Sequence, residues 1–332
     1  MIIHVYFGDS KRHPIINNYI RSGFGDLCID APPIIGKSRF FARFSRAFSL
    51  IRRICSIRTE VKAPIFHTHD LISVLLVLLL MPRKKVIFDS HEVYRSYFRS
   101  WFAFYSIYLL EEAAHFFSDL TIYPSDERRC LYRQCPNDVV IENKFLVEHY
   151  AQNFNGNLNA TYLYAGELTD KRCISELVAI FRRLPSKSLH IYGKLNEQFD
   201  ESYFLNVPAN IVYGGCITHS EMVERIGDFT AAFALYNKID LNNTFPAPTK
   251  IFENEYFKVP TICFSSPYVD RLISDGTLRR VVTLEHLTLR EVETAMGIIE
   301  GMDNNIDPSP NITWQSQLRD IENMYIGLRK KQ

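Results

Sequence analysis

Short apolar runs alternate with amphipathic stretches along almost the whole chain, and this alternation predicts the fold. The runs typical of buried strands lie at 2–7, 27–29, 64–67, 85–89, 120–123 and 139–143, and then at 160–164, 189–192, 211–213, 231–235 and 260–264. The stretches with helical spacing lie between them, at 12–22, 38–58, 70–81, 96–118, 125–134, 174–183, 219–226, 249–257, 267–274 and 289–301. Strands that alternate with helices form parallel sheets covered on both faces. We therefore predict an α/β fold with two Rossmann-like, doubly wound domains facing across a cleft.

A polar stretch interrupts the alternation at 148–159, and we interpret it as a linker between domains. The predicted domains are 1–147 and 160–310. The last segment, 311–332, contains an amphipathic helix that begins near Trp314.

Composition excludes several classes of protein. Hydrophobic residues make up 47% of the 332 residues and charged residues 23%, and the net charge is +1, so we expect a globular protein that does not bind nucleic acid. The seven cysteines are scattered without a CxxC pair, and the chain starts directly in a strand, so we expect reduced thiols and a cytoplasmic location. The apolar run 71–81 is shorter than the roughly 20 residues of a membrane span, and we predict a buried helix there.

One segment, 248–253, predicts an anion site. Pro248 and Thr249 suit the start of a helix, where free N–H groups and the helix dipole favour a phosphate, and Lys250 lies beside them. Glu253, one turn later, could accept hydrogen bonds from a ribose diol. The alternative is an ordinary helix start with a surface Lys250–Glu253 pair.

Four more polar motifs each follow a predicted strand: His67–Asp70, Asp89–Glu92, Gly166–Arg172 and Gly214–Gly215. In a parallel sheet such positions share the edge where ligands bind. In this order the motifs resemble those of the GT-B glycosyltransferases, most closely glycosyltransferase family 4, with its "H-x-H-D", "D-S-H-E", "Y-x-G-x-L" and "P-x-K-x-F-E" patterns.

The resemblance implies transfer of a sugar from a nucleotide-diphosphate sugar, expected to be a UDP sugar, to an acceptor hydroxyl. It also implies retention of configuration, no metal and no cofactor, and a C-terminal helix that crosses back to the first domain. The pathway we expect is assembly of a surface polysaccharide of the O-antigen or capsule type, on a glycan or lipid-linked acceptor.

For the donor, we assign Arg172 and Lys250 to the leaving diphosphate, because fixed cations stabilise the charge that develops there. Glu253 is assigned to the ribose. The remaining donor-binding candidates share a position in the turns after strands or at the helix start; they are Gly166, Lys171, Gly215, Cys216, Ile217, Thr249 and Ile251.

For the sugar and acceptor, the resemblance points to His91, flanked by Asp89 and Glu92. The family pattern places a further glutamate eight residues before Glu253, where this chain has Phe245. Asn242 and Asn243 are our candidates to replace it.

Residues 37–62 form a basic, aromatic segment. The segment contains eight basic residues and one acidic residue, Glu60, so its net charge is +7. The basic residues are Lys37, Arg39, Arg43, Arg46, Arg52, Arg53, Arg58 and Lys62. Apolar residues fall at helical spacing between them: Phe40, Phe41, Phe44, Phe48, Ile51 and Cys55. The segment is either a helix on the inner face of an anionic membrane or a core helix with a charged rim.

Two other functions fit the same sequence. A nucleotide-sugar 2-epimerase would have the same architecture without an acceptor groove. A catalytically inactive nucleotide-sugar-binding protein would explain the glutamate missing at Phe245.

Overall fold

The computed structural model describes residues 1–31, 39–60, 63–147, 160–303 and 306–330. These form two compact units, one of Met1–Asn143 with Gln317–Gln332 and one of Lys144–Ser316. The first unit thus ends before residue 147, and the segment 148–159, interpreted above as a linker, lies outside the described residues.

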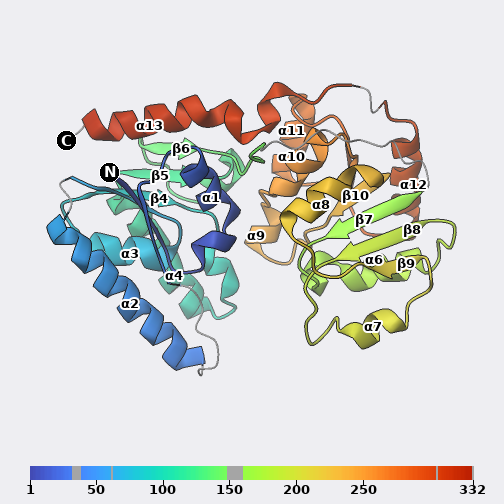
Figure 1. Ribbon diagram of the computed structural model, residues 1–332, viewed down its shortest axis with the longest axis horizontal. Helices are drawn as coiled ribbons and strands as arrows, with labels where there is room; N and C mark the ends of the chain where they lie inside the picture. Colours follow the sequence, from blue (N-terminus) through green and yellow to red (C-terminus); the bar gives the residue numbers. More distant parts are fainter. Residues whose placement is uncertain (32–38, 61–62, 148–159, 304–305, 331–332) are drawn as a thin grey trace. The chain divides into compact units, whose positions relative to one another are not determined.

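The first unit is built on a six-stranded sheet in the order β2-β1-β3-β4-β5-β6, in which each neighbouring pair is parallel (Figure 1). Its strands are β1 (Ile2–Tyr6), β2 (Leu27–Asp30), β3 (Ile65–Thr68), β4 (Lys85–Asp89), β5 (Leu120–Tyr123) and β6 (Asp138–Val140). Its helices are α1 (Pro14–Arg21), α2 (Arg39–Glu60), α3 (Leu71–Leu80), α4 (Trp101–Phe117), α5 (Asp126–Arg129) and α13 (Leu318–Lys330).

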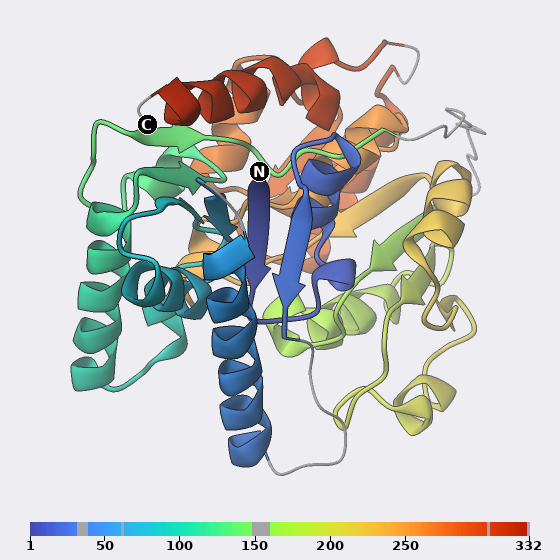
Figure 2. The same ribbon diagram turned by 60° about the vertical axis from the view of Figure 1, so that its left-hand side comes forward.

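Helix α13 belongs to this first unit although it ends the chain (Figures 1 and 2). Gln317, just before it, exchanges hydrogen bonds with the backbone of Glu142 after β6. Tyr325 stacks on Phe24, and its hydroxyl lies 2.6 Å from Nδ1 of His67. One face of the helix is therefore fixed to the body of the unit.

The second unit has a parallel six-stranded sheet in the order β12-β11-β10-β7-β8-β9. Its strands are β7 (Thr161–Ala165), β8 (Ser188–Tyr192), β9 (Ile211–Tyr213), β10 (Ala231–Ala234), β11 (Thr261–Phe264) and β12 (Val281–Leu284). Its helices are α6 (Ile174–Phe181), α7 (Glu201–Leu205), α8 (His219–Arg225), α9 (Leu241–Thr244), α10 (Thr249–Tyr256), α11 (Pro267–Ser274) and α12 (Leu289–Glu300). Apolar clusters cover both of its faces.

The predicted doubly wound α/β class is confirmed. Among the strands and α-helices of the described residues, three were not predicted: β12, α7 and α9. The two helices are only five and four residues long and depend on the caps Asp200 and Asp240, not on an apolar stripe. Strand β12 is a four-residue edge strand that follows Arg280, so its apolar run is short.

Two helices are less buried than their sequences indicate. In α3, which we predicted to be buried, Leu79 is 76% exposed while Val74 and Val77 are fully buried. In α2 the core contacts come from Leu50, Ile54 and Ile57, whereas Phe48 and Cys55 of the predicted apolar face are exposed. Within the described part of the chain, no helix combines the length and apolar character needed to span a bilayer.

The fit of α13 predicts unequal effects for two isoleucines on that helix. Ile321 is fully buried and Ile326 is 38% exposed. We expect Ile321→Ala to lower the free energy of unfolding by about 2–5 kcal/mol, because it leaves a cavity. Ile326→Ala is the matched control and should cost below about 1 kcal/mol. Urea denaturation measures both, and equal losses would contradict the packing of α13 described above.

Candidate functional site

The turns after β7, β8 and β9 pack backbone against backbone at one edge of the second sheet. The N–H of Gly166 donates to Tyr192 O at 2.9 Å, and the N–H of Gly193 donates to Gly215 O at 3.0 Å. A Cβ on Gly193 would lie only 2.1 Å from the carbonyl oxygen of Gly166. Gly166 and Gly215 also have positive φ angles, 156° and 87°, which glycine adopts without strain. The close approach thus requires glycine at this edge.

Helix α10 begins at this edge without a side-chain cap. Its N-cap is Pro248, whose side chain has no hydrogen-bond acceptor, whereas Thr218 and Ser266 cap α8 and α11 with their hydroxyls. The first N–H groups of α10 are therefore not satisfied by a cap and favour an anion. The predicted helix start at Thr249 agrees with the structure.

Lys250 brings a positive charge to the same point. A Cβ on Gly166 would lie 2.8 Å from its Nζ, so the ammonium group rests against the glycine turn. The pKa of Lys250 is lowered to about 8, mainly by burial; Glu253 opposes the change and Arg172 contributes to it. These effects place both Arg172 and Glu253 within electrostatic reach of Lys250.

Arg172 is held by an aromatic ring and keeps one nitrogen without a partner. Its guanidinium lies over Tyr236, 4.0 Å from the ring centroid. Its Nη1 is buried and has no hydrogen-bond partner among the described residues. Cys173 follows in the left-handed conformation, with a φ of 56°, which turns the chain from the 3-10 helix Asp170–Arg172 into α6.

Glu253 lies against a histidine, not against the Lys250 of the alternative interpretation. Its Oε1 lies 2.7 Å from Nε2 of His219 at the start of α8, so the surface Lys250–Glu253 pair considered above is not formed. Ile251 is fully buried, and only its backbone N–H can serve a ligand.

The other donor candidates lie around this point. Lys171 is turned away, with its Nζ 3.2 Å from Oδ2 of Asp240. Gly215 lies at the edge, Cys216 is exposed, and Ile217 packs on the apolar cluster that contains Ile251. Asn243 in α9 is buried beside a narrow gap that Pro248 and Ile251 also line, and Asn242 is half-buried.

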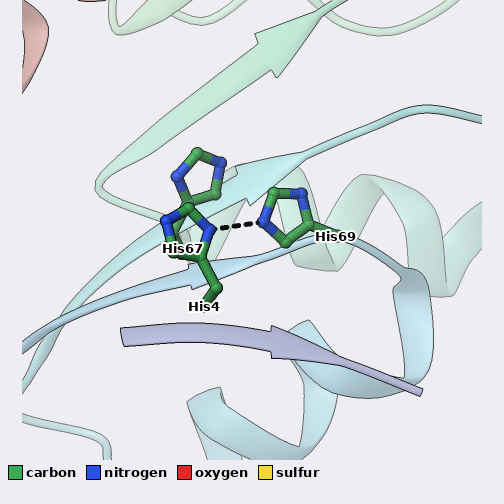
Figure 3. Close-up of side chains that lie close together, drawn as sticks. All are labelled: His4, His67 and His69. Atoms are coloured by element: carbon green, nitrogen blue, oxygen red, sulfur yellow. Dashed lines mark hydrogen bonds between the residues drawn. The ribbon is translucent and has the colours of Figure 1, made fainter. Parts of the chain in front are cut away.

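In the first unit the sequence motifs come together as a histidine cluster. Nδ1 of His4 lies 2.7 Å from Nε2 of His69 (Figure 3). Nδ1 of His69 lies 3.2 Å from Nε2 of His91. His67 packs its ring against His69, with centroids 4.4 Å apart. Asp89 has Oδ2 3.4 Å from Nε2 of both His67 and His91.

Burial controls the protonation of this cluster. It lowers the pKa of His4, His67 and His91 to about 3 and raises the pKa of Asp89 to about 6. The imidazoles are therefore neutral at physiological pH.

The cluster borders a cavity of about 350 Å³. Its polar lining includes Tyr6, His13, His69, His91 and Glu92, and Phe98 and Ile107 are among its apolar walls. Glu92 is exposed and accepts a hydrogen bond from Tyr97. Asp89 is nearly inaccessible, so it can act on a ligand only through the histidines.

Two groups in the cluster are close enough to be compared with a metal site, His4–His67–His69 and His69–Asp89–His91. Nitrogens that share a tetrahedral zinc lie about 3.3 Å apart, which is longer than the 2.7 Å between His4 and His69. In the second group the facing nitrogens of His69 and His91 are 3.2 Å apart and the ring centroids 5.5 Å, so the lone pairs point along one line. A hydrogen bond accounts for that geometry.

Sequence reasoning missed His4, His13, His219, Tyr236 and Tyr325. His4 lies inside a predicted strand, where a histidine gives no signal of its partners. The others are joined to the sites only by contacts across 20 or more positions in sequence, such as His67 with Tyr325.

No protein-family model and no curated protein sequence matches the chain. Solved structures do match it. Sucrose-phosphate synthase from Thermosynechococcus elongatus has a TM-score of 0.72 at 12% identity over 100% of both chains. Anabaena HepE in complex with UDP-glucose has a TM-score of 0.65 at 12% identity, over 100% of this chain and 99% of HepE. TarM has a TM-score of 0.58 at 13% identity, over 84% of this chain and 58% of its own. The chain therefore has the predicted GT-B type of fold.

The glycine edge yields a structural prediction. Gly193→Ala would place a methyl group against Gly166 O, so we expect a loss of about 1–3 kcal/mol in the free energy of unfolding. Gly297→Ala, in α12 with no atom within 4 Å of the new Cβ, is the control and should be neutral or stabilising. Chemical denaturation measures both. A Gly193→Ala protein as stable as the control would show that the turns can separate freely.

Proposed function

We propose that this protein is a glycosyltransferase that moves a sugar from a UDP sugar to an acceptor hydroxyl. The observation that carries the proposal is the convergence of Lys250, Arg172 and the uncapped start of α10 on the Gly166 turn. Donors of both kinds, cationic side chains and free backbone N–H groups, suit a diphosphate. Two structural neighbours, HepE and TarM, have been solved in complex with UDP, which supports a uridine nucleotide.

The same residues suit departure of the nucleoside diphosphate. Breaking the glycosidic bond places negative charge on the leaving phosphate, and preorganised cations stabilise it. Arg172, whose Nη1 has no described partner, offers a fork for phosphate oxygens, and Lys250 a point charge. Glu253 would accept the ribose hydroxyls, and the turn from Gly215 to Ile217 would flank the base.

The sugar and acceptor roles are assigned to the first unit's cavity and to α9. His91 and Glu92 line that cavity, with Asp89 acting behind His91. Asn243 and Asn242 are proposed for the position of the missing glutamate. Retention, independence from metal and a role in surface-polysaccharide assembly remain parts of the proposal that rest on the resemblance to glycosyltransferase family 4.

We also propose that the protein works at the inner face of an anionic membrane, and that α4 supplies the contact. Trp101 and Phe102 are 74% and 75% exposed, and the exposed apolar stripe continues along the helix through Tyr105, Leu109, Phe116 and Phe117. Arg83 and Lys84 border the same surface hollow as Phe117. Basic residues beside exposed aromatics fit an anionic lipid surface. In the segment 37–62, the side chain of Arg46 forms hydrogen bonds within the first unit, where it donates to Phe7 O and Ala31 O.

The donor site gives the first functional prediction. Lys250→Ala should reduce turnover of a UDP sugar about 10²–10³-fold, because the leaving diphosphate loses a cation. Lys187→Ala, which removes only a surface pair with Glu300, should leave turnover within about threefold of the natural protein. Turnover is measured as the release of UDP from a panel of UDP sugars in the presence of glycan acceptors. Unchanged turnover in Lys250→Ala would refute the role.

The pKa of Lys250 gives a second readout of the same variant. A diphosphate binds the protonated lysine better, so affinity for UDP should fall as pH rises through about 8, with proton uptake on binding above that pH. The dependence of UDP affinity on pH should disappear in Lys250→Ala.

The same assays distinguish the alternative functions. UDP binding without turnover of any sugar would favour the inactive binding protein, and conversion of a UDP sugar without acceptor would favour the epimerase.

The membrane contact is tested by vesicle flotation. Trp101→Ala with Phe102→Ala should weaken binding to anionic vesicles at least about tenfold, because two exposed apolar anchors are lost. Leu205→Ala, an equally exposed residue on α7, is the control and should have no effect. Unchanged flotation of the double variant would exclude α4 as the contact.

A further inference from the structure

The rings of His4, His69 and His91 lie end to end. The centroids of His4 and His69 are 5.1 Å apart, while their facing nitrogens are 2.7 Å apart and the planes differ by 15°. For His69 and His91 the values are 5.5 Å, 3.2 Å and 8°. In each pair the centroid distance exceeds the nitrogen distance by about the depth of one ring, so the nitrogens point at each other (Figure 3 for His4 and His69).

A backbone carbonyl fixes the first proton in this hydrogen-bonded row of three histidines. Nε2 of His4 lies 2.7 Å from Phe24 O, which can only accept, so His4 carries its proton on Nε2. A neutral imidazole has one N–H, and Nδ1 of His4 must therefore accept from Nε2 of His69. By the same argument Nδ1 of His69 accepts from Nε2 of His91.

These tautomers require neutral imidazole rings, and the surroundings of the rings keep them neutral. His4 is fully buried and His69 is 1% exposed. Burial lowers the pKa of both, and the neighbouring histidines act in the same direction. Asp89 does not decide between the tautomers, because its Oδ2 lies 3.4 Å from Nε2 of His91 and 3.5 Å from Nδ1 of His69. The order of the protons is set by the carbonyl of Phe24.

The last histidine of the row, His91, borders the cavity. His91 lines that cavity, and no described residue forms a hydrogen bond with its Nδ1. That nitrogen is also not among the buried polar atoms that lack a partner, so the cavity reaches it.

We propose that Phe24 O, acting through His4 and His69, fixes His91 in the tautomer that offers Nδ1 as a hydrogen-bond acceptor to the cavity. His4 and His69 are then positioning residues for His91. The ligand group that fits is a hydroxyl that donates its proton to Nδ1. That this hydroxyl belongs to a sugar rests on the proposed function, whereas the tautomer itself does not.

The proposal is tested on the free protein by long-range proton–nitrogen NMR of histidines labelled with ¹⁵N. We expect His4, His69 and His91 each to show a protonated Nε2 and an unprotonated Nδ1. Signals are assigned by single His→Gln variants. His115, a buried histidine that is not part of the row, is the internal reference, and its signals should not change in any of these variants.

Two variants at position 4 separate positioning from general structure. His4→Phe removes the acceptor for His69, so His91 should become a mixture of tautomers, and kcat/KM should fall about tenfold as one oriented hydrogen bond is weakened. His4→Gln offers a carbonyl oxygen to His69 and should restore both the single tautomer and most of the activity.

Three results would overturn the proposal. They are a His91 with its proton on Nδ1, a His91 protonated on both nitrogens at neutral pH, and a stoichiometric metal in the purified protein that shifts the His69 and His91 signals when chelated. The first two are read from the natural protein and do not depend on its activity. A correct tautomer in a protein without transferase activity would refute the proposed function and leave the tautomer assignment intact.

Discussion

Parallel pairing of the strands is the constraint on which both units depend. Parallel neighbours must be joined by crossovers, so each strand's carboxyl end lies at the same edge, and the residues that follow the strands meet there. In the second unit this brings together the turns at Gly166, Gly193 and Gly215. In the first unit it places His69 after β3 beside His91 after β4. Each candidate site is a consequence of strand order.

The two edges use this convergence in different ways. The second unit collects positive charge: Lys250 and Arg172 lie near an uncapped helix start, and the carboxylate of Glu253 lies against His219. Burial, and to a smaller extent the charge of Arg172, disfavours the charged form of Lys250 and lowers its pKa, and a bound anion would oppose both effects. In the first unit the histidines of the cluster are instead neutral, since burial disfavours the imidazolium form.

The neutral histidines explain how a buried polar cluster can be both stable and ordered. A buried polar group is costly unless it is hydrogen-bonded. His4 satisfies both ring nitrogens, with Phe24 O and His69, and His67 bonds Tyr325 of α13. The last helix of the chain is therefore tied to the same cluster as the first strand. Loss of one member would leave another buried nitrogen without a partner, which makes the cluster cooperative.

The sequence by itself determined the fold class, most element positions and the residues after each strand, because apolar periodicity and capping residues are local signals. It pointed to Lys250 and Arg172 through their positions next to predicted strands and helices, and to His91 through the resemblance to glycosyltransferase family 4. Only the tertiary structure decided the partners: Glu253 lies against His219 and not Lys250, and Lys171 turns to Asp240. The partners in such pairs are separated by tens to hundreds of residues in the sequence, and no local pattern encodes which residues meet. For the same reason the core decided which of the described side chains of α2 are buried: Leu50, Ile54 and Ile57 pack there, whereas Phe48 is exposed.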